Sequence, residues 1–274
     1  MKVPDTRQSI PDFVLQLRQK LPQWAHTDWL EQTGSTNADL FELARQYRTP
    51  EHWPRLLGSN HQTQGKGRAG RPWLDRSGET LMFSCGFMLN MPTRLLAGVA
   101  PALGIATCEA LRPLAGHDIG RLSMKWPNDI MIDDSKLAGI LVESRIMGNG
   151  IFLVVGMGLN LAGASDLSAE LNRDVSDWSS LDGAVAERSR LVAQVAQSWQ
   201  QCLALHSLAP LQHLRESFEL FDYLRNRQVN VLQGDQIQLT GTASGLAEDG
   251  SLLVRLADGT MESVRVGDIS VRKV

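Results

Sequence analysis

The residues best suited to chemistry lie in a short glycine-rich segment, GKGRAGRPW, at positions 65–73. Its three glycines alternate with cations that could attract a phosphate or a carboxylate, namely Lys66, Arg68 and Arg71. The first six letters fit the G-x-G-x-x-G pattern of dinucleotide-binding loops, but that pattern requires a helix immediately after it. The next apolar run, LMFSCGFML at 81–89, is typical of a buried strand. A Walker A loop is also excluded, because no Ser or Thr follows the lysine.

Four other motifs place polar groups or glycines at fixed spacing: GSTN at 34–37, KWPND at 125–129, KLAG at 136–139 and GMGLN at 156–160. Three of them have an ordinary structural interpretation when taken singly. GSTN is a common helix N-cap, WPND a common turn, and GMGLN a common strand end where backbones approach closely. Lysine is scarce in this chain. Three of its six lysines fall in the glycine-rich segment or in these motifs: Lys66, Lys125 and Lys136.

The surrounding sequence predicts a mixed α/β fold. Apolar residues at helical spacing predict helices over 10–21, 35–47, 95–111, 184–206 and 210–224. Ser35 and Thr36 are expected to cap the second of these, with Asp39 completing a capping box. Apolar runs predict strands over 81–89, 121–132 (interrupted by a turn), 136–145 and 151–161. From residue 228, short alternating runs broken by glycine turns indicate a small β-barrel appended to the larger domain.

The composition indicates a soluble globular protein. The chain has 274 residues, of which 43% are hydrophobic, enough for one large domain with or without a smaller one. No secretory signal is predicted, because the first twenty residues carry several charges and no unbroken apolar run. The apolar stretch 95–111 contains Pro101 and Glu109 and falls short of the roughly 20 residues of a membrane span. It is therefore predicted to be a buried helix.

Charge and cysteine usage exclude further classes. The net charge of −3 argues against general affinity for nucleic acid. The three cysteines, Cys85, Cys108 and Cys202, are far apart and set among apolar neighbours. They are predicted to be buried thiols in the reducing cytoplasm, and no Cys or His spacing indicates a metal site.

Taken in order, the motifs resemble those of the biotin protein ligases. GSTN, Q-x-x-G-K-G-R-x-G-R-x-W, KWPND, KLAGILVE and G-x-G-L-N follow one another, and the resemblance spans residues 28–274. It implies a mixed-sheet catalytic domain of the biotin/lipoate ligase type over residues 1–225 and an SH3-like β-barrel over 226–274. It also implies a two-step reaction. Biotin and MgATP give biotinyl-5′-AMP and pyrophosphate, and biotin then passes to a lysine of a biotin carboxyl carrier protein domain.

The resemblance also assigns roles residue by residue. The catalytic residues are expected to be Lys125, Lys136 and Arg68. The residues expected to bind biotin are Ser35, Thr36, Asn37, Gln62, Lys66, Gly67, Arg68, Lys136 and Gly139. The residues expected to bind ATP and the adenylate are Arg68, Arg71, Trp73, Asn128, Asn160 and Trp178. For Trp178, an ordinary partly buried tryptophan remains an equal alternative.

These residue types suit the chemistry that the resemblance implies. The ureido ring of biotin has one carbonyl acceptor and two N–H donors, which short polar side chains can satisfy. A carboxylate that approaches a triphosphate is repelled by about 4 kcal/mol per pair of unit charges at 4 Å and an effective dielectric near 20. Preorganised cations, with Mg²⁺ entering on ATP, would cancel that repulsion.

The glycine-rich segment departs from the family pattern at two positions. Lys66 stands where arginine is common, and Ala69 replaces a basic or polar residue. The segment is predicted to be a mobile lid that closes over biotin and the adenylate. Ordering it costs about 1–2 kcal/mol per residue, and more for glycine, so ligand contacts are needed to offset that cost.

Three other functions share some of these sequence features. A lipoate or octanoyl transferase shares the core fold, but Gln62 and the S-T-N cluster would be unpaired beside an aliphatic chain. A DNA-binding repressor needs an N-terminal winged-helix domain, and only about 30 residues precede GSTN, so no specific nucleic-acid partner is expected. A module that only sequesters biotin would not need Lys125 and Lys136. The expected location is the cytoplasm, with no membrane partner, and the sequence does not decide between a monomer and a homodimer.

Overall fold

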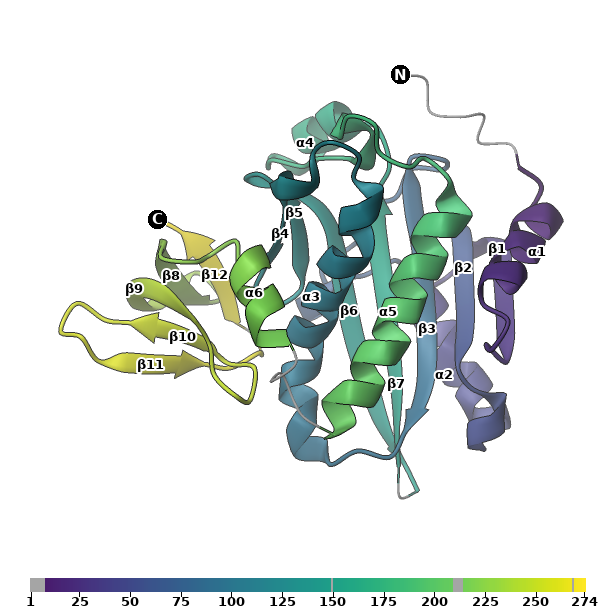
Figure 1. Cartoon of the computed structure of the whole chain (residues 1–274), viewed down its shortest axis with the longest axis horizontal. Coiled ribbons are helices and arrows are strands. Elements are labelled where there is room, and N and C mark those ends of the chain that lie inside the picture. The colour runs from purple at the N-terminus through teal and green to yellow at the C-terminus, as the bar shows by residue number, and fades with distance from the viewer. Residues whose placement is uncertain (1–7, 149, 209–213, 268) are drawn as a thin grey trace.

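The computed structural model describes residues 8–148, 150–208, 214–267 and 269–274, and these form two sheets of unequal size (Figure 1). The larger sheet has the strand order β1-β2-β3-β7-β6-β5-β4. The strand bounds, in the same order, are His26–Thr33, Arg55–Gln62, Thr80–Leu89, Gly150–Asn160, Ser135–Met147, Asp129–Ile132 and Leu122–Lys125. β1 and β2 run parallel and the other neighbours run antiparallel. The predicted mixed α/β class is confirmed.

Helices cover both faces of this sheet. The α-helices of the described residues are α1 (Ile10–Lys20), α2 (Thr36–Gln46), α3 (Val99–Leu111), α4 (Ala164–Leu171), α5 (Arg188–Leu208) and α6 (Arg215–Phe221). Short 3-10 turns occur at Pro50–His52, Arg68–Gly70, Thr93–Gly98, Arg112–Leu114, Ile119–Arg121 and Trp178–Ser180. In Figure 1, α3 and α5 lie in front of the sheet and α2 lies behind it. The main core cluster lies on the α3 and α5 side, and a smaller one lies under α2.

One helical run, Thr93–Leu114, is longer than the sequence indicated. It has 22 residues and is long and apolar enough to cross a membrane by length and composition. The expectation that this segment falls short of a span was therefore wrong. Eleven of the thirteen residues of α3 are nevertheless buried, as predicted. The indole N–H of Trp199 on α5 donates to Thr107 Oγ1 at 2.8 Å, so the apolar composition is that of a core helix packed on its neighbour.

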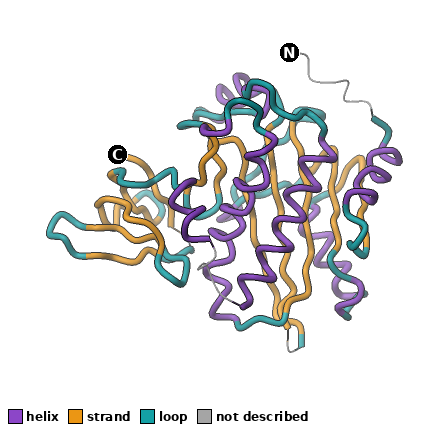
Figure 2. The backbone as a smooth tube through the Cα atoms, viewed as in Figure 1, coloured by secondary structure: helices purple, strands orange, loops and turns teal. Residues whose placement is uncertain are grey.

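The smaller sheet is antiparallel and is built from the end of the chain. Its strand order is β11-β10-β9-β8-β12, with bounds Met261–Val264, Leu252–Arg255, Gln236–Leu246, Gln228–Gln233 and Ile269–Lys273. Figure 2 shows its strands as a group apart from the large sheet. A small β-barrel was predicted at this end of the chain from the density of turn residues, and the structure has a separate small antiparallel sheet there. The division at residues 225 and 226 falls between α6 and β8 and stays a prediction.

Asp134, in the turn before β6, ties the smaller sheet to the larger one. Its carboxylate accepts hydrogen bonds from Tyr223 Oη at 2.8 Å, Arg227 at 2.8 Å and Lys273 Nζ at 3.1 Å. The bond from Arg227, followed by those from Tyr223 and Lys273, holds the pKa of Asp134 well below its usual range. A second tie runs from the Trp126 indole N–H to the Gly250 carbonyl at 3.0 Å.

Asp222, between α6 and β8, provides a test of how this junction responds to pH. Burial raises its carboxyl pKa to about 6 from 3.8, against the opposing effects of the Leu224 N–H bond, Arg225 and Arg227. The folded state therefore disfavours the ionised form, and the resulting loss of stability grows from pH 4 and is complete above pH 6. Asp222→Asn keeps an acceptor for Leu224 and is expected to raise the free energy of unfolding by about 1–3 kcal/mol at pH 7 to 8.

Denaturant unfolding between pH 4 and 8 measures this effect. The gain should fall towards zero as the pH is lowered from 7 to 4, because the native carboxyl is then already protonated. A gain of equal size at both ends of this range would contradict the assignment.

All three cysteines are free and buried, as predicted. Cys85 and Cys108 have no exposed surface and Cys202 is 4% exposed. Burial raises the pKa of all three thiols, that of Cys202 to about 12. The thiolate forms are therefore suppressed at neutral pH.

Candidate active site

The floor of the candidate site consists of two rows of residues that are aligned across the neighbouring strands β3, β7 and β6. One row aligns Ser84, Gly156 and Leu141, and the next aligns Met82, Gly158 and Gly139. Alternation along β7 places Phe152 and Val154 on the same face as these glycines, where they pack under α2. The sequence thus changes from large side chains to glycine along one face of one strand. A cavity of about 820 Å³ opens above the glycines.

The polar end of the cavity is built at the start of α2. The backbone N–H of Thr36 donates to Gln62 Oε1 at 2.8 Å, and Thr36 Oγ1 lies 2.6 Å from Ser84 Oγ. Ser35 occupies the N-cap position but makes no side-chain capping bond, and Asp39 accepts from Thr33 Oγ1 at 2.6 Å. The predicted capping box was therefore wrong. A strand residue distant in sequence satisfies the helix start, which fixes α2 to the end of β2.

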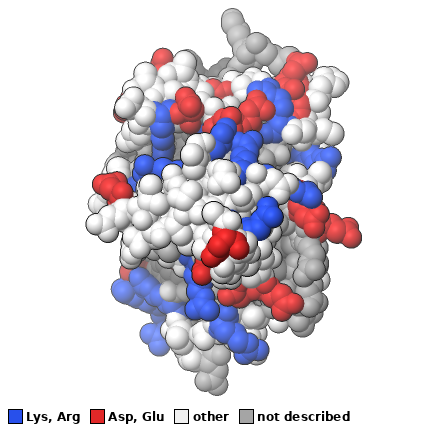
Figure 3. Space-filling model, turned by 90° about the vertical axis from the view of Figure 1, so that its left-hand side faces the viewer, with Lys and Arg blue, Asp and Glu red and all other residues white. Residues whose placement is uncertain are grey.

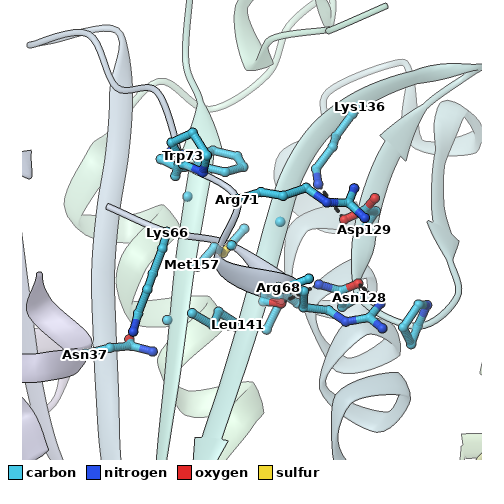
Figure 4. Close-up of a pocket in the computed structure, with 18 of the residues that line it drawn as sticks. Asn37, Lys66, Arg68, Arg71, Trp73, Asn128, Asp129, Lys136, Leu141 and Met157 are labelled. Atoms are coloured by element: carbon cyan, nitrogen blue, oxygen red, sulfur yellow. Dashed lines mark hydrogen bonds and ion pairs between the residues drawn. The ribbon is translucent and has the colours of Figure 1, made fainter. Parts of the chain in front are cut away.

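The opposite end of the cavity gathers cations. Lys136 Nζ lies 2.5 Å from Asp129 Oδ1, and Arg68 donates to Asn128 Oδ1 at 3.3 Å. Desolvation lowers the pKa of Lys125, and Lys136 and Arg272 lower it further, while Asp129 opposes them. Figure 4 shows Arg68, Arg71, Asn128, Asp129 and Lys136 on one side of the cavity and Asn37 on the other. The site is therefore polar at one end and mainly positive at the other.

The glycine-rich segment folds across this cavity as a closed loop. Gly67 N–H donates to the Arg71 carbonyl at 2.8 Å, and Trp73 N–H donates to the Gly65 carbonyl at 2.9 Å. At its tip, Ala69 has a φ of 53° and Gly70 a φ of 68°. Arg68 also donates to the Gly267 carbonyl of the C-terminal domain at 2.6 Å. The loop therefore contacts both the part of the chain that forms the larger sheet, through Asn128, and the part that forms the smaller sheet, through Gly267.

Trp73 lies directly on the glycine floor. A Cβ added at Gly158 would lie 2.3 Å from its ring, and one added at Gly139 would lie 3.2 Å from it and 3.1 Å from Lys136 Nζ. The indole N–H of Trp73 is buried without a hydrogen-bond partner. Glycine is therefore needed at these positions for close approach of the tryptophan ring.

Thirteen of the fifteen predicted site residues line this one cavity. They are Ser35, Thr36, Asn37, Gln62, Lys66, Gly67, Arg68, Arg71, Trp73, Lys125, Asn128, Lys136 and Gly139. Asn160 and Trp178 are not in the lining. Asn160 donates to the Ser176 carbonyl at 3.1 Å, and the Trp178 indole donates to the Val185 carbonyl at 2.9 Å within the core. The ligand roles of these two residues stay predictions, and the environment of Trp178 is that of an ordinary buried tryptophan.

Some lining residues were not identified from the sequence. Ser84, Asp129, Arg173 and Arg272 line the cavity together with the predicted residues. Asp129 adjoins Asn128 in a motif already singled out, so its position carried a usable signal. Arg272 comes from β12 of the small sheet, and nothing in the local sequence indicates that β12 reaches the site.

Comparison with known proteins agrees with this geometry. Residues 29–160 match the model of the Biotin/lipoate A/B protein ligase family, and residues 226–272 match that of the Biotin protein ligase C terminal domain. The chain is 34% identical over 199 residues to the biotin–[acetyl-CoA-carboxylase] ligase of Paracoccus denitrificans, an alignment that covers 67% of this chain and 77% of the relative. The chain belongs to the biotin protein ligase family.

Other members of the biotin protein ligase family match over different lengths. The bifunctional ligase/repressor BirA of Escherichia coli is 31% identical over 78% of this chain and 65% of its own length. The Mycobacterium tuberculosis ligase is 33% identical over 63% of this chain and 62% of its own length. The chain thus spans slightly less than two thirds of these two relatives. The structure of the Aquifex aeolicus biotin protein ligase in complex with biotin and ATP superimposes with a TM-score of 0.73 at 25% identity, covering 91% of this chain and 99% of that one.

Proposed function

We propose that this chain is an ATP-dependent biotin protein ligase that acts in the cytoplasm. The observation that carries the proposal is the single cavity with short polar side chains at one end and Lys125, Lys136, Arg68 and Arg71 at the other. Biotin has the same polarity, with a ureido ring at one end and a carboxylate at the other. Family membership supports the same assignment, and the Aquifex relative was solved with biotin and ATP bound.

In the proposed first step, a biotin carboxylate oxygen attacks the α-phosphorus of ATP, and the bond to pyrophosphate breaks. Lys125, Lys136 and Arg68 would offset the repulsion between the carboxylate and the phosphates, and Arg71 would assist. Lys136 is already held by Asp129, so its ammonium group needs little reorganisation. Mg²⁺ would enter with ATP as part of the substrate. Asp129 is the one carboxylate among the described lining residues, which suits a metal held mainly by phosphate oxygens and water.

In the proposed second step, a lysine amine of a biotin carboxyl carrier protein domain attacks the carbonyl of the mixed anhydride, and AMP leaves. No residue is assigned as general base, since an activated acyl phosphate held next to the amine can react largely through proximity. The carrier of acetyl-CoA carboxylase or of a related carboxylase is the proposed partner.

We further propose that the chain has no operator-binding role. On the face that carries the C-terminal sheet, Lys and Arg side chains share the surface with Asp and Glu side chains (Figure 3). This arrangement does not favour a DNA duplex, whose binding rests on neutralising successive phosphates. A sequence-dependent gel shift that survives moderate salt would overturn this part of the proposal.

The ligase function is tested by incubating the protein with biotin, ATP, Mg²⁺ and a carrier domain, followed by mass spectrometry. One biotinyl increment on the carrier is expected, together with biotinyl-5′-AMP when the carrier is omitted. A parallel thermal shift should show stabilisation by biotin and not by lipoate. Stabilisation by lipoate alone, or the absence of both products, would reject the function.

The lid role of residues 65–73 leads to a separate prediction. Biotin with ATP is expected to slow tryptic cleavage after Lys66 and Arg68 by about tenfold or more, because ligand contacts reduce opening of the loop. The exposed Arg48, after α2, provides an internal control whose cleavage should not change. Equal slowing at Arg48 would indicate general stabilisation, and no slowing in the loop would exclude a lid.

A further inference from the structure

Glu143 lies on β6 next to the polar end of the cavity, but it is not among the lining residues. One carboxylate oxygen accepts a hydrogen bond from Asn37 Nδ2 at 2.7 Å. The other lies 3.7 Å from Lys66 Nζ of the glycine-rich loop. Glu143 therefore reaches the site through two residues that do line the cavity.

A chain of short hydrogen bonds continues from Asn37 into the cavity. Asn37 Oδ1 lies 2.6 Å from Ser84 Oγ, and Ser84 Oγ lies 2.6 Å from Thr36 Oγ1. These three residues are between 0% and 4% exposed, so their polar groups must find partners within the site. The backbone N–H of Thr36 donates to Gln62 Oε1.

The direction of every bond in this chain follows from the number of available protons. An ionised carboxylate can only accept, so the amide nitrogen of Asn37 faces Glu143 and its oxygen faces Ser84. Ser84 then donates its one hydroxyl proton to Asn37, and the contact between Ser84 and Thr36 requires Thr36 to donate. If Thr36 instead donated to Gln62 Oε1, at 3.2 Å, two lone pairs would face each other across 2.6 Å at Ser84.

This direction decides what the cavity offers to a ligand. The proton of Thr36 is committed to Ser84, so Thr36 Oγ1 presents lone pairs and acts as an acceptor. The oxygen of Gln62 is committed to the start of α2, so Gln62 presents its amide nitrogen, which also contacts Met82 Sδ at 3.2 Å. An acceptor beside a donor complements a cyclic urea, in which N–H groups flank a carbonyl.

We infer that Glu143 is a positioning residue that sets the hydrogen-bond direction at this end of the cavity and thereby determines selectivity for a cyclic urea. The inference rests on the proposed function, because it takes the ureido ring of biotin as the group bound here. It assigns Glu143 no contact with the ligand and no part in the chemical step.

Glu143→Gln tests the inference with almost no change in size. The new amide can donate to Asn37, so the Asn37 amide can turn over and the chain can reverse. Ser84 then donates to Thr36 and occupies one of its lone pairs, and the Thr36 proton turns towards Gln62 Oε1 or the ureido N–H, so Thr36 becomes a poorer acceptor for the ligand. Biotin affinity, measured by calorimetry without ATP, is expected to fall about 10- to 100-fold, as for a buried polar group left unpaired. The KM for biotin should rise with it, while kcat and the KM for ATP stay unchanged. Glu143→Asp, which can still only accept, should restore most of the affinity.

Glu31→Gln is the matched control, because Glu31 also accepts from an asparagine, Asn60 Nδ2 at 3.0 Å, but lies on β1 outside the cavity lining. It should leave biotin affinity unchanged. Lys66→Met removes the ion pair between Lys66 and Glu143 and leaves the hydrogen-bond chain from Glu143 to Thr36 in place. Glu143→Gln should still weaken biotin binding in that background.

Ser84→Ala interrupts the chain between Asn37 and Thr36. In the Ser84→Ala background, Glu143→Gln should cause no further loss of biotin affinity, because no hydrogen bond then connects Asn37 to Thr36. Full additivity of the two changes, or wild-type affinity in Glu143→Gln with an unchanged melting temperature, would overturn the inference. Failure of the wild-type protein to bind biotin would instead reject the proposed function on which the inference rests.

Discussion

Replacing Lys136 by methionine is expected to lower the rate of biotinyl-5′-AMP formation by about 10²- to 10³-fold, the usual effect of losing one preorganised charge-stabilising group. Lys136 lies at the cationic end of the cavity, and its side chain is 19% exposed. Methionine keeps much of the side-chain length without the charge, so packing changes little. Single-turnover measurement of pyrophosphate release gives the rate, and biotin affinity should fall far less than the rate.

Lys20→Met is the control for this change, because Lys20 also forms an ion pair, with Glu187 at 3.0 Å, but lies on α1 outside the cavity lining. It should leave adenylate formation intact. Part of the loss in Lys136→Met comes from the carboxylate of Asp129, which is left without its partner. Adding Asp129→Asn should therefore recover part of the rate. A wild-type rate in Lys136→Met would exclude Lys136 from the reaction.

Gly158→Ala is expected to weaken biotin binding by about 10- to 100-fold, equivalent to the 1–3 kcal/mol that overpacking commonly costs. The new methyl group would lie 2.3 Å from the Trp73 ring, far inside normal contact distance. The ring must leave the strand, and the loop must move with it because Trp73 N–H bonds to the Gly65 carbonyl. Calorimetry with biotin measures the loss.

Gly120→Ala provides the matched control, because a Cβ at Gly120 would meet nothing within 4 Å. It should bind biotin as the wild-type protein does. The melting temperature of Gly158→Ala separates the two possible causes of weaker binding. An unchanged melting temperature with faster tryptic cleavage of the loop would locate the effect in the Trp73 contact. Unaltered biotin affinity would show that Trp73 can leave the floor without cost.

The parts of the fold that the sequence predicted well are those with strong local patterns. The runs at 81–89 and 151–161 were recognised as strands because β3 and β7 are central strands, buried along most of their length. Helix α4 was not predicted, since its eight residues bury only Leu167 and leave little periodic signal. The capping of α2 was predicted wrongly because the partner of its first N–H, Gln62, lies 26 residues away and cannot be inferred from local sequence.

Prediction of the candidate site is limited in the same way, because contacts between residues distant in sequence cannot be inferred from local patterns. The order and spacing of the motifs were enough to predict that most of the lining residues share one site. Glu143 ends the KLAGILVE motif, but its role, like that of Ser84, could not be assigned from the sequence, because strand alternation gives the face of a side chain but not its partner on another strand. Their contacts with Asn37 depend on the register of β3, β7 and β6 and on the position of α2 above them.

The burial of all three native thiols has a practical consequence. A cysteine placed at Ala69, an exposed residue at the tip of the glycine-rich loop, would be the accessible sulfur for a maleimide dye, with no need to delete native cysteines first. The dye would sit on the segment that bridges the strands of the site and the C-terminal domain. Its fluorescence could then follow opening and closing of the loop in real time, in a protein whose core is otherwise untouched.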